Sequence, residues 1–267
     1  MIDSLVQHTL NSEIEFSGVG LHTGCKCTMK VFPAEDNYGY KFQRRDLDGK
    51  PIIDATTNNV SSTLRSTSLS KDGVEVHTTE HILAALYAMG IDNALISLDA
   101  PEIPIMDGSA LEFITEIKRV GSKKLTAKRK VYKFRKNISF VDKEKEIEMI
   151  IVPNKNNEFK VTVMIDYKSP VLGTQHASID GLENFEKELA SCRTFVFMKE
   201  VAHLADNGLI KGGEVDNAVV LANRPYSKEE LAEIGKNIGR DDINILPNKI
   251  GVVSTSELRF NNEPARH

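Results

Sequence analysis

The sequence predicts an α+β fold made of two similar tandem domains, each an α/β sandwich in which helices cover one face of a sheet. Three observations support this prediction. Strand patterns and then helix patterns occupy residues 13–120, strand patterns begin again after a basic stretch at 123–136, and two segments 120 residues apart resemble each other. Strands followed by helices in each half are typical of α+β proteins. We therefore expect a first domain over 1–126 and a second over 127–267.

The first half contains four predicted strands. Apolar and polar residues alternate along 13–16, 26–32 and 40–43, as they do in strands with one buried face. A short apolar run at 94–98 fits a strand that is buried on both faces.

Two helices complete the first half. The first is expected over 79–89, with threonines before it for capping and Gly90 directly after it. The second begins at a capping box formed by Ser109 and Glu112, continues with apolar residues at helical spacing, and stops at Gly121.

The second half repeats the strand pattern. Three further strands are predicted at 131–141, 147–152 and 159–167. We interpret the basic stretch before them as a solvated linker. Residues 28–33 match 148–153 in pattern, and the same shift of 120 residues carries Asp46 onto Asp166. A duplicated unit of sheet and helices explains this similarity.

Residues 223–256 interrupt the similarity between the halves. They contain a capping box at Ser227 and Glu230 and a polar loop at 239–242, and we interpret them as a surface insertion with one short helix. The second domain is expected to be incomplete at residue 267, because the repeated unit is not finished there.

Composition narrows the class of protein. Of 267 residues, 40% are hydrophobic and 27% charged, which is typical of globular proteins, and the net charge of −4 argues against a nucleic-acid partner. The longest apolar runs are far shorter than the roughly 20 residues that cross a bilayer, and the N-terminus lacks a signal-peptide pattern. The three cysteines, Cys25, Cys27 and Cys192, form no disulfide or zinc-ribbon pattern. We expect a cytoplasmic monomer.

His81 is the strongest metal-ligand candidate among the seven histidines, because Glu80 precedes it at the start of an amphipathic helix. Adjacent helical residues point about 100° apart, so one can bind a metal while the other addresses a water on that metal. The helix N-terminus also favours an ionised Glu80. A glutamate that opens a helix is common without any such role.

Three glycines surround His22 in residues 18–24, which indicates a tight turn. A kinase-like nucleotide-binding protein would need a glycine-rich loop that opens a helix. The strand pattern at 26–32 follows this loop instead, so that alternative is weak.

Seven segments, taken together and in this order, resemble the UDP-3-O-acyl-N-acetylglucosamine deacetylases, zinc enzymes of lipid A biosynthesis in Gram-negative bacteria. The resemblance covers nearly the whole chain apart from 223–256. The segments are Gly-Val-Gly-Leu-His-Thr-Gly at 18–24, Thr-Thr-Glu-His at 78–81, Gly-Ile-Asp-Asn at 90–93, Ala-Pro-Glu-Ile-Pro-Ile-Met-Asp-Gly-Ser at 100–109, Arg-Thr-Phe-x-Phe-Met at 193–198, Gly-Leu-x-x-Gly-Gly at 208–213 and Leu-Arg-Phe-x-Asn-Glu-Pro-x-Arg-His at 258–267.

The resemblance implies roles for individual residues. His81 and His267 would bind Zn²⁺, Glu80 would be the general base, and the Thr194 hydroxyl would donate to the developing oxyanion. The family's third zinc ligand is an aspartate four residues after the position of His267, and a further catalytic histidine follows it. Because the sequence ends before both positions, we expect it to be truncated at the C-terminus.

The resemblance also implies a binding site for an acyl chain. Residues 195–220 match a family insertion that forms an apolar passage, which would be lined by Phe195, Val201, Ile210, Gly213, Ala218 and Val220. Without the resemblance these residues fit an ordinary core. His22 matches a family histidine near the metal that is not a ligand, and its role stays open.

The implied reaction is the zinc-dependent hydrolysis of the N-acetyl group of UDP-3-O-(hydroxyacyl)-N-acetylglucosamine, which releases acetate in the committed step of lipid A biosynthesis. The partners would be this acylated UDP-sugar and, transiently, the surface of the inner membrane. The alternative is a catalytically incomplete fragment of the same fold that only binds the nucleotide sugar. Some family members continue into a fused dehydratase domain, and the sequence leaves this open.

Overall fold

A five-stranded sheet forms the centre of the first half in the computed structural model, which describes residues 5–154, 159–213, 217–237, 245–254 and 257–267. The strand order is β2-β3-β9-β4-β5, and β4 and β9 are the parallel pair. The strands are β2 (Ile14–Val19), β3 (Lys26–Pro33), β4 (Tyr40–Arg44), β5 (Ile52–Asp54) and β9 (Ala94–Leu98).

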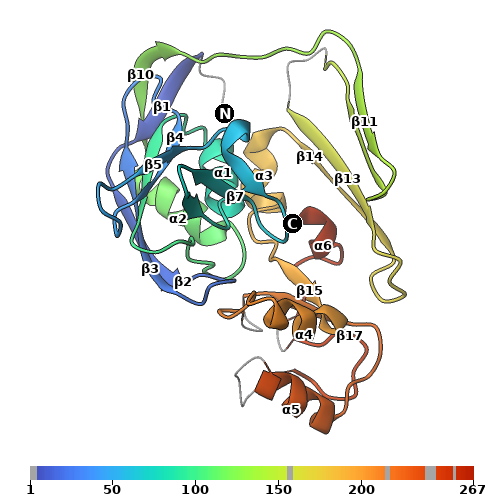
Figure 1. The fold of residues 1–267 in the computed structure, drawn as a ribbon. Helices are drawn as coiled ribbons and strands as arrows, with labels where there is room; N and C mark the ends of the chain where they lie inside the picture. Colours follow the sequence, from blue (N-terminus) through green and yellow to red (C-terminus); the bar gives the residue numbers. More distant parts are fainter. Residues whose placement is uncertain (1–4, 155–158, 214–216, 238–244, 255–256) are drawn as a thin grey trace.

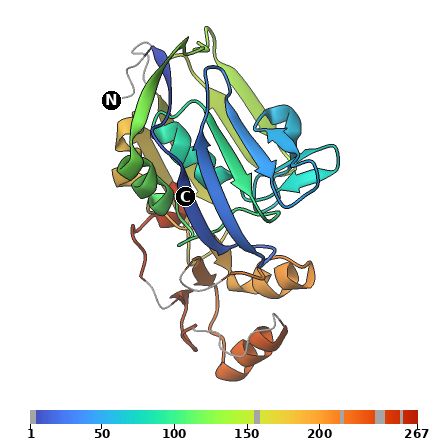
Figure 2. The same cartoon turned by 90° about the vertical axis from the view of Figure 1, so that its left-hand side faces the viewer.

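Two helices, α1 (Glu80–Ala88) and α2 (Leu111–Val120), lie against one face of this sheet (Figures 1 and 2). The ring of Phe16 on β2 meets that of Phe113 on α2 edge to face, 5.0 Å between centroids. Both side chains belong to the core that the sheet and the two helices share. Burial of these apolar faces is the main source of the stability of the first half.

Shorter elements surround this sandwich. Strand β1 (Val6–Leu10) pairs with β10 (Ser122–Lys128) in antiparallel fashion. A three-stranded sheet precedes α1 and consists of β6 (Val60–Ser62), β7 (Ser68–Lys71) and β8 (Val74–Val76), after the single turn η1 (Thr57–Asn59).

The second half consists of small sheets and short helices (Figure 1). Two hairpins pair β11 (Ile138–Asp142) with β12 (Ile147–Ile151) and β13 (Lys160–Asp166) with β14 (Thr174–Asp180). A third sheet contains β15 (Phe195–Phe197), β16 (Val219–Ala222) and β17 (Gly251–Val252). The helices are η2 (Leu182–Asn184), α3 (Phe185–Glu188), α4 (Met198–Asp206), α5 (Lys228–Asn237) and α6 (Glu263–Arg266).

The predicted α+β class is confirmed, and the two helices of the first half lie where the sequence placed them. The duplication and the division into domains at 126/127 stay predictions. The described part of the second half forms separate two- and three-stranded sheets. Among the described residues, none of the helices is long and apolar enough to cross a membrane.

The basic stretch differs from the expected linker. Residues 123–128 belong to β10, where Leu125 and Ala127 are half-buried between exposed neighbours. The stretch was predicted as a linker because a strand that is mostly polar, with only two partly buried residues, has the composition of a linker. The strand predicted over 131–141 is shorter than expected and starts at Ile138. Before it, Arg129 ties the chain to the first half through hydrogen bonds to Asp92 at 2.7 and 2.8 Å.

One predicted capping box is confirmed and one is wrong. The Ser227 backbone N–H donates to Glu230 Oε2 at 2.8 Å, and the Glu230 N–H donates to Ser227 Oγ at 3.2 Å. At α2 the N-cap position falls on Ala110, which has no capping group. The Ser109 hydroxyl donates to Asp107 at 2.7 Å, and its oxygen accepts the Leu111 N–H at 3.2 Å, so Glu112 takes no part. The loop expected at 239–242 lies outside the described residues.

Candidate active site

The two predicted zinc ligands lie side by side. His81 occupies the first turn of α1, and His267 directly follows α6. Their ring centroids are 5.2 Å apart and the planes are tilted by 41°. Two imidazoles far apart in the sequence therefore meet where the first helix begins and the last one ends.

Glu80 is held beside His81 by Thr67, the residue directly before β7. The Thr67 backbone N–H donates to Glu80 Oε2 at 2.8 Å, and the Thr79 hydroxyl donates to the Thr67 carbonyl at 2.9 Å. Burial raises the pKa of Glu80, and the hydrogen bonds from its own backbone and from Thr67 oppose this only in part. A carboxyl group with a raised pKa is a better proton acceptor near neutral pH.

Both histidines are neutral at pH 7. Burial lowers the pKa of His81 to about 3, and His267 lowers it further, while hydrogen bonding to the Ser109 backbone acts in the opposite direction. His267 is exposed as a residue, but desolvation of its ring still lowers the pKa, against the effect of the Cys192 backbone. Neutral imidazole is the form that binds a metal ion.

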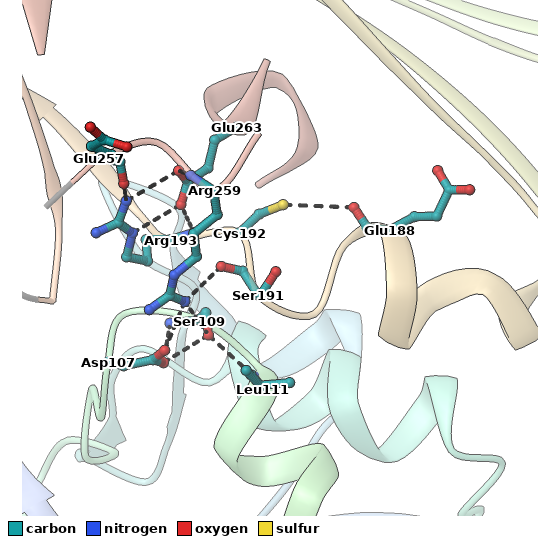
Figure 3. A network of polar contacts seen from close by, with 10 residues as sticks. All are labelled: Asp107, Ser109, Leu111, Glu188, Ser191, Cys192, Arg193, Glu257, Arg259 and Glu263. Carbon is teal, nitrogen blue, oxygen red and sulfur yellow. Dashed lines mark hydrogen bonds and ion pairs between the residues drawn. The ribbon is translucent and has the colours of Figure 1, made fainter. Parts of the chain in front are cut away.

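A buried ion pair holds the helix that precedes His267 (Figure 3). Arg193 is 1% exposed and Glu263 is fully buried. The Arg193 backbone N–H and Nε each donate to Glu263 Oε1 at 2.9 Å, and Arg193 Nη2 donates to Glu263 Oε2 at 3.2 Å. The Arg259 backbone N–H adds a bond to Oε2 at 2.7 Å. Glu263 thereby fixes α6, and with it His267, to the segment before β15.

A second arginine joins the same segment to the first half (Figure 3). Arg259 Nη1 donates to Asp107 Oδ2 at 2.8 Å and to the Ser191 carbonyl at 2.7 Å. Asp107 also accepts the Ser109 hydroxyl just before α2. This network links the turn at 106–109 to the part of the chain that positions His267.

Thr194 follows Arg193 directly and is half-buried. Its backbone N–H donates to the Gly108 carbonyl at 2.8 Å, and its carbonyl accepts the Val219 N–H at 2.8 Å. The backbone of Thr194 is therefore fixed between the turn of the first half and strand β16.

The residues predicted to line an acyl passage lie in and around α4 and the sheet of β15 and β16. Val201, Ala218 and Val220 are buried, whereas Phe195 and Ile210 are half-buried. Val201 and Val220 share an apolar cluster with Met198, Ala222 and Tyr226, against which Ile210 packs. A Cβ atom on Gly213 would lie 3.2 Å from the Ile210 carbonyl oxygen. Burial of this kind fits an ordinary core as well as a passage.

Glu102 and His22 are two buried residues near this site for which the sequence predicts no role. Glu102 is fully buried, and the His22 side chain is 7% exposed. Neither ring nitrogen of His22 has a hydrogen-bond partner among the described residues. The sequence offers one indication that Glu102 is buried: it is the single charged residue in the otherwise apolar segment 100–105.

The donor set fits a zinc site in part. The described residues contain no group of three or more His, Cys, Asp or Glu placed to hold a metal ion. His81 and His267 supply two neutral nitrogen donors, and catalytic zinc sites use three protein ligands. Burial raises the pKa of Cys27 and Cys192 to about 12, so neither thiol is ready to bind a metal or act as a nucleophile.

Comparison with known proteins gives the family. The family model for UDP-3-O-acyl N-acetylglycosamine deacetylase, LpxC, matches residues 7–234. A protein of Bacteroides thetaiotaomicron named bifunctional enzyme LpxC/FabZ is 43% identical over 263 residues, which are 98% of this chain and 56% of that protein. A Syntrophotalea carbinolica protein named UDP-3-O-acyl-N-acetylglucosamine deacetylase is 43% identical over 218 residues, 81% of this chain and 69% of that protein.

A third relative, from Porphyromonas gingivalis, is also named bifunctional enzyme LpxC/FabZ and is 43% identical over 261 residues, 98% of this chain and 56% of that protein. The chain thus spans about half the length of these bifunctional relatives. The extent of the family match and the identities, together with the paired histidines beside Glu80, lead to one conclusion: the chain belongs to the UDP-3-O-acyl N-acetylglycosamine deacetylase family.

Proposed function

We propose that the protein hydrolyses the N-acetyl group of UDP-3-O-(hydroxyacyl)-N-acetylglucosamine and releases acetate. The strongest support is the pairing of two neutral imidazoles, His81 and His267, next to a carboxyl group of raised pKa, Glu80. Relatives that bear the name of this activity are 36–43% identical to the chain. The proposed compartment is the cytoplasm, where a monomer would meet its substrate at the inner face of the membrane.

His81 and His267 are the proposed zinc ligands within this chain, and the family pattern adds an aspartate four residues after the position of His267. That spacing places both side chains on one face of a helix. When bound, zinc lowers the pKa of its water and polarises the carbonyl of the substrate.

The residues of the chain perform the proton transfers and the positioning. The Glu80 carboxylate takes the proton of the attacking water, which its raised pKa favours. Thr194, with its backbone held between residue 108 and β16, presents its hydroxyl to the negative charge that develops on the amide oxygen. The C–N bond of the amide then breaks, the leaving nitrogen takes up a proton, and acetate and the free amine are released.

Metal removal from the full-length natural protein tests this function. Acetate release from the acylated UDP-sugar should disappear with a chelator and return with zinc. His81→Ala should bind zinc much more weakly. Acetate release that survives the loss of zinc would contradict the proposal. Binding of the nucleotide sugar without acetate release by the zinc-loaded protein would favour a role in binding alone.

We also propose that residues 195–220 form the acyl passage, within a second domain that covers 127–267. A larger side chain at Gly213 would project next to Ile210, which packs against the apolar cluster of Val201 and Val220. Gly213→Met should therefore shift the preference towards shorter acyl chains, measured as relative kcat/KM over a series of chain lengths. An unchanged series would exclude Gly213 from the passage.

A further inference from the structure

Glu102 is a buried carboxylate held by four hydrogen-bond donors. It is fully buried in the segment between β9 and α2. The His22 backbone N–H reaches its two oxygens at 3.0 and 3.1 Å. The Thr23 N–H and hydroxyl donate to Oε2 at 2.7 and 2.8 Å, and the Thr78 hydroxyl donates to Oε1 at 2.7 Å. A buried charge is tolerated only when hydrogen bonds replace its hydration, so these donors and Glu102 require one another.

These donors come from two parts of the proposed active site. His22 and Thr23 lie in the glycine-rich loop 18–24, whereas Thr78 lies two residues before Glu80. The Thr78 hydroxyl connects Glu102 to the residues just before α1, where Glu80 lies. One side chain thus joins the loop of His22 to the start of α1.

The backbone is tightly constrained in both segments that contact the Glu102 side chain, at Thr78 and in the loop 18–24. Thr78 has a φ of +61°, a left-handed conformation that is strained for a β-branched residue, and it is 1% exposed. On the loop side, a Cβ atom on Gly20 would lie 2.4 Å from Glu102 Oε2. Residues 211 and 212 close over the loop through N–H bonds to the carbonyls of His22 and Leu21, at 3.2 and 3.0 Å.

The ring of His22 needs a partner from outside the described chain. Burial lowers the pKa of this imidazole, and the charge of Glu102 and the nearby Arg65 backbone offset the effect only in part. Neither ring nitrogen makes a hydrogen bond of ordinary geometry with a described residue. A buried polar group in that state costs stability unless something that enters the site satisfies it.

We propose that Glu102 is a positioning residue. It holds the loop of His22 at a fixed position relative to Glu80, and it acts on the reaction through the His22 ring. This inference rests on the proposed deacetylation. The carboxylate holds the loop through the backbone N–H groups of His22 and Thr23, so its main effect on the reacting atoms passes through His22. A misplacement of about 1 Å at such a group can lower the rate about 100-fold.

A double-mutant cycle in the full-length, zinc-loaded protein tests the proposal. The variants are Glu102→Gln, which keeps the shape but removes the charge, His22→Ala, and the double substitution. Glu102→Gln should lower kcat about tenfold or more with little change in KM and with normal zinc content. In the His22→Ala background the same substitution should lower kcat by less than about twofold, because its main route to the reaction is already gone.

Asp99→Asn is the matched control. Asp99 lies three residues before Glu102 and accepts the Thr28 N–H at 2.7 Å and Arg45 Nη2 at 2.8 Å, two donors outside the loop 18–24. This substitution should leave kcat unchanged. Equal, additive losses of kcat from Glu102→Gln in both backgrounds would overturn the proposal, because a general structural defect would not depend on His22.

Amide hydrogen exchange separates this inference from the proposed function. The His22 and Thr23 amides should exchange about tenfold faster in Glu102→Gln than in the wild type, and should not change in Asp99→Asn. A wild type without acetate release would contradict the proposed deacetylation, whatever the exchange rates. Unchanged exchange at His22 and Thr23 would contradict the positioning by Glu102, whatever the activity.

Discussion

Replacement of Glu263 by glutamine tests how the protein holds His267 in place. The Glu263 carboxylate accepts hydrogen bonds from Arg193 and Arg259, and both members of the Arg193–Glu263 pair are almost completely buried. Glutamine keeps the size of the side chain but removes the negative charge that Glu263 places against the Arg193 guanidinium. The helix that precedes His267 would lose its main anchor.

The burial of the pair sets the size of the effect. Removal of one partner of a buried ion pair typically costs about 3–5 kcal/mol, because an uncompensated charge stays inside the protein. Burial acts to raise the pKa of Glu263, but the hydrogen bonds from Arg193 and Arg259 outweigh it and the pKa is lowered. A lowered carboxyl pKa means that the contribution to stability is fully present at pH 7 and is lost as the pH falls through the lowered pKa.

Thermal unfolding at pH 7 is the assay, with zinc content as a second measurement. Glu263→Gln should lower the Tm by roughly 6 °C or more and should weaken zinc binding. Glu186→Gln is the control, because Glu186 pairs with Lys118 at 2.8 Å but both side chains are about half exposed, at 46% and 50%. Exposed pairs contribute about 0–1 kcal/mol. Equal, small shifts of Tm in both variants would show that the buried Arg193–Glu263 pair does not hold α6 in place.

Two further predictions concern packing and thiol chemistry. Gly108→Ala should be strongly destabilising in denaturant titrations, because its Cβ atom would lie 1.8 Å from the carbonyl oxygen of Asn217 and Gly108 has a φ of +81°; a variant with wild-type stability would contradict this close approach. A thiol reagent at pH 8 should modify the exposed Cys25 in the native protein but not the buried Cys27 and Cys192, whose pKa burial raises to about 12. Rapid modification of all three thiols before unfolding would show that the two buried cysteines are accessible.

The spacing of apolar residues along the sequence was enough to predict strands and helices that have a clearly buried face. Strand β9 was predicted residue for residue from its apolar run, and α1 from its helical spacing and the glycine after it. Strands β1 and β10 were not predicted, since they pair across almost the whole first half and β10 is mostly exposed. Pairing between distant polar strands leaves little trace in either segment alone.

The candidate site was predicted only where residue types are distinctive. Glu80 and His81 stand out in the sequence, but only the family resemblance connected them to His267. Glu102 was missed because three of its contacts come from the backbone and hydroxyl of two loop residues, His22 and Thr23, and backbone donors have no sequence signature.

Zinc-dependent deacetylation with Glu80 as the general base is tested by measuring acetate release and zinc content together for the full-length wild type and Glu80→Gln. Glu80 takes the proton of the attacking water and is not a zinc ligand in this account. The variant should therefore bind as much zinc as the wild type while kcat falls by about 10²–10⁴-fold. A Glu80→Gln variant that keeps its zinc and releases acetate at the wild-type rate would contradict the role of Glu80.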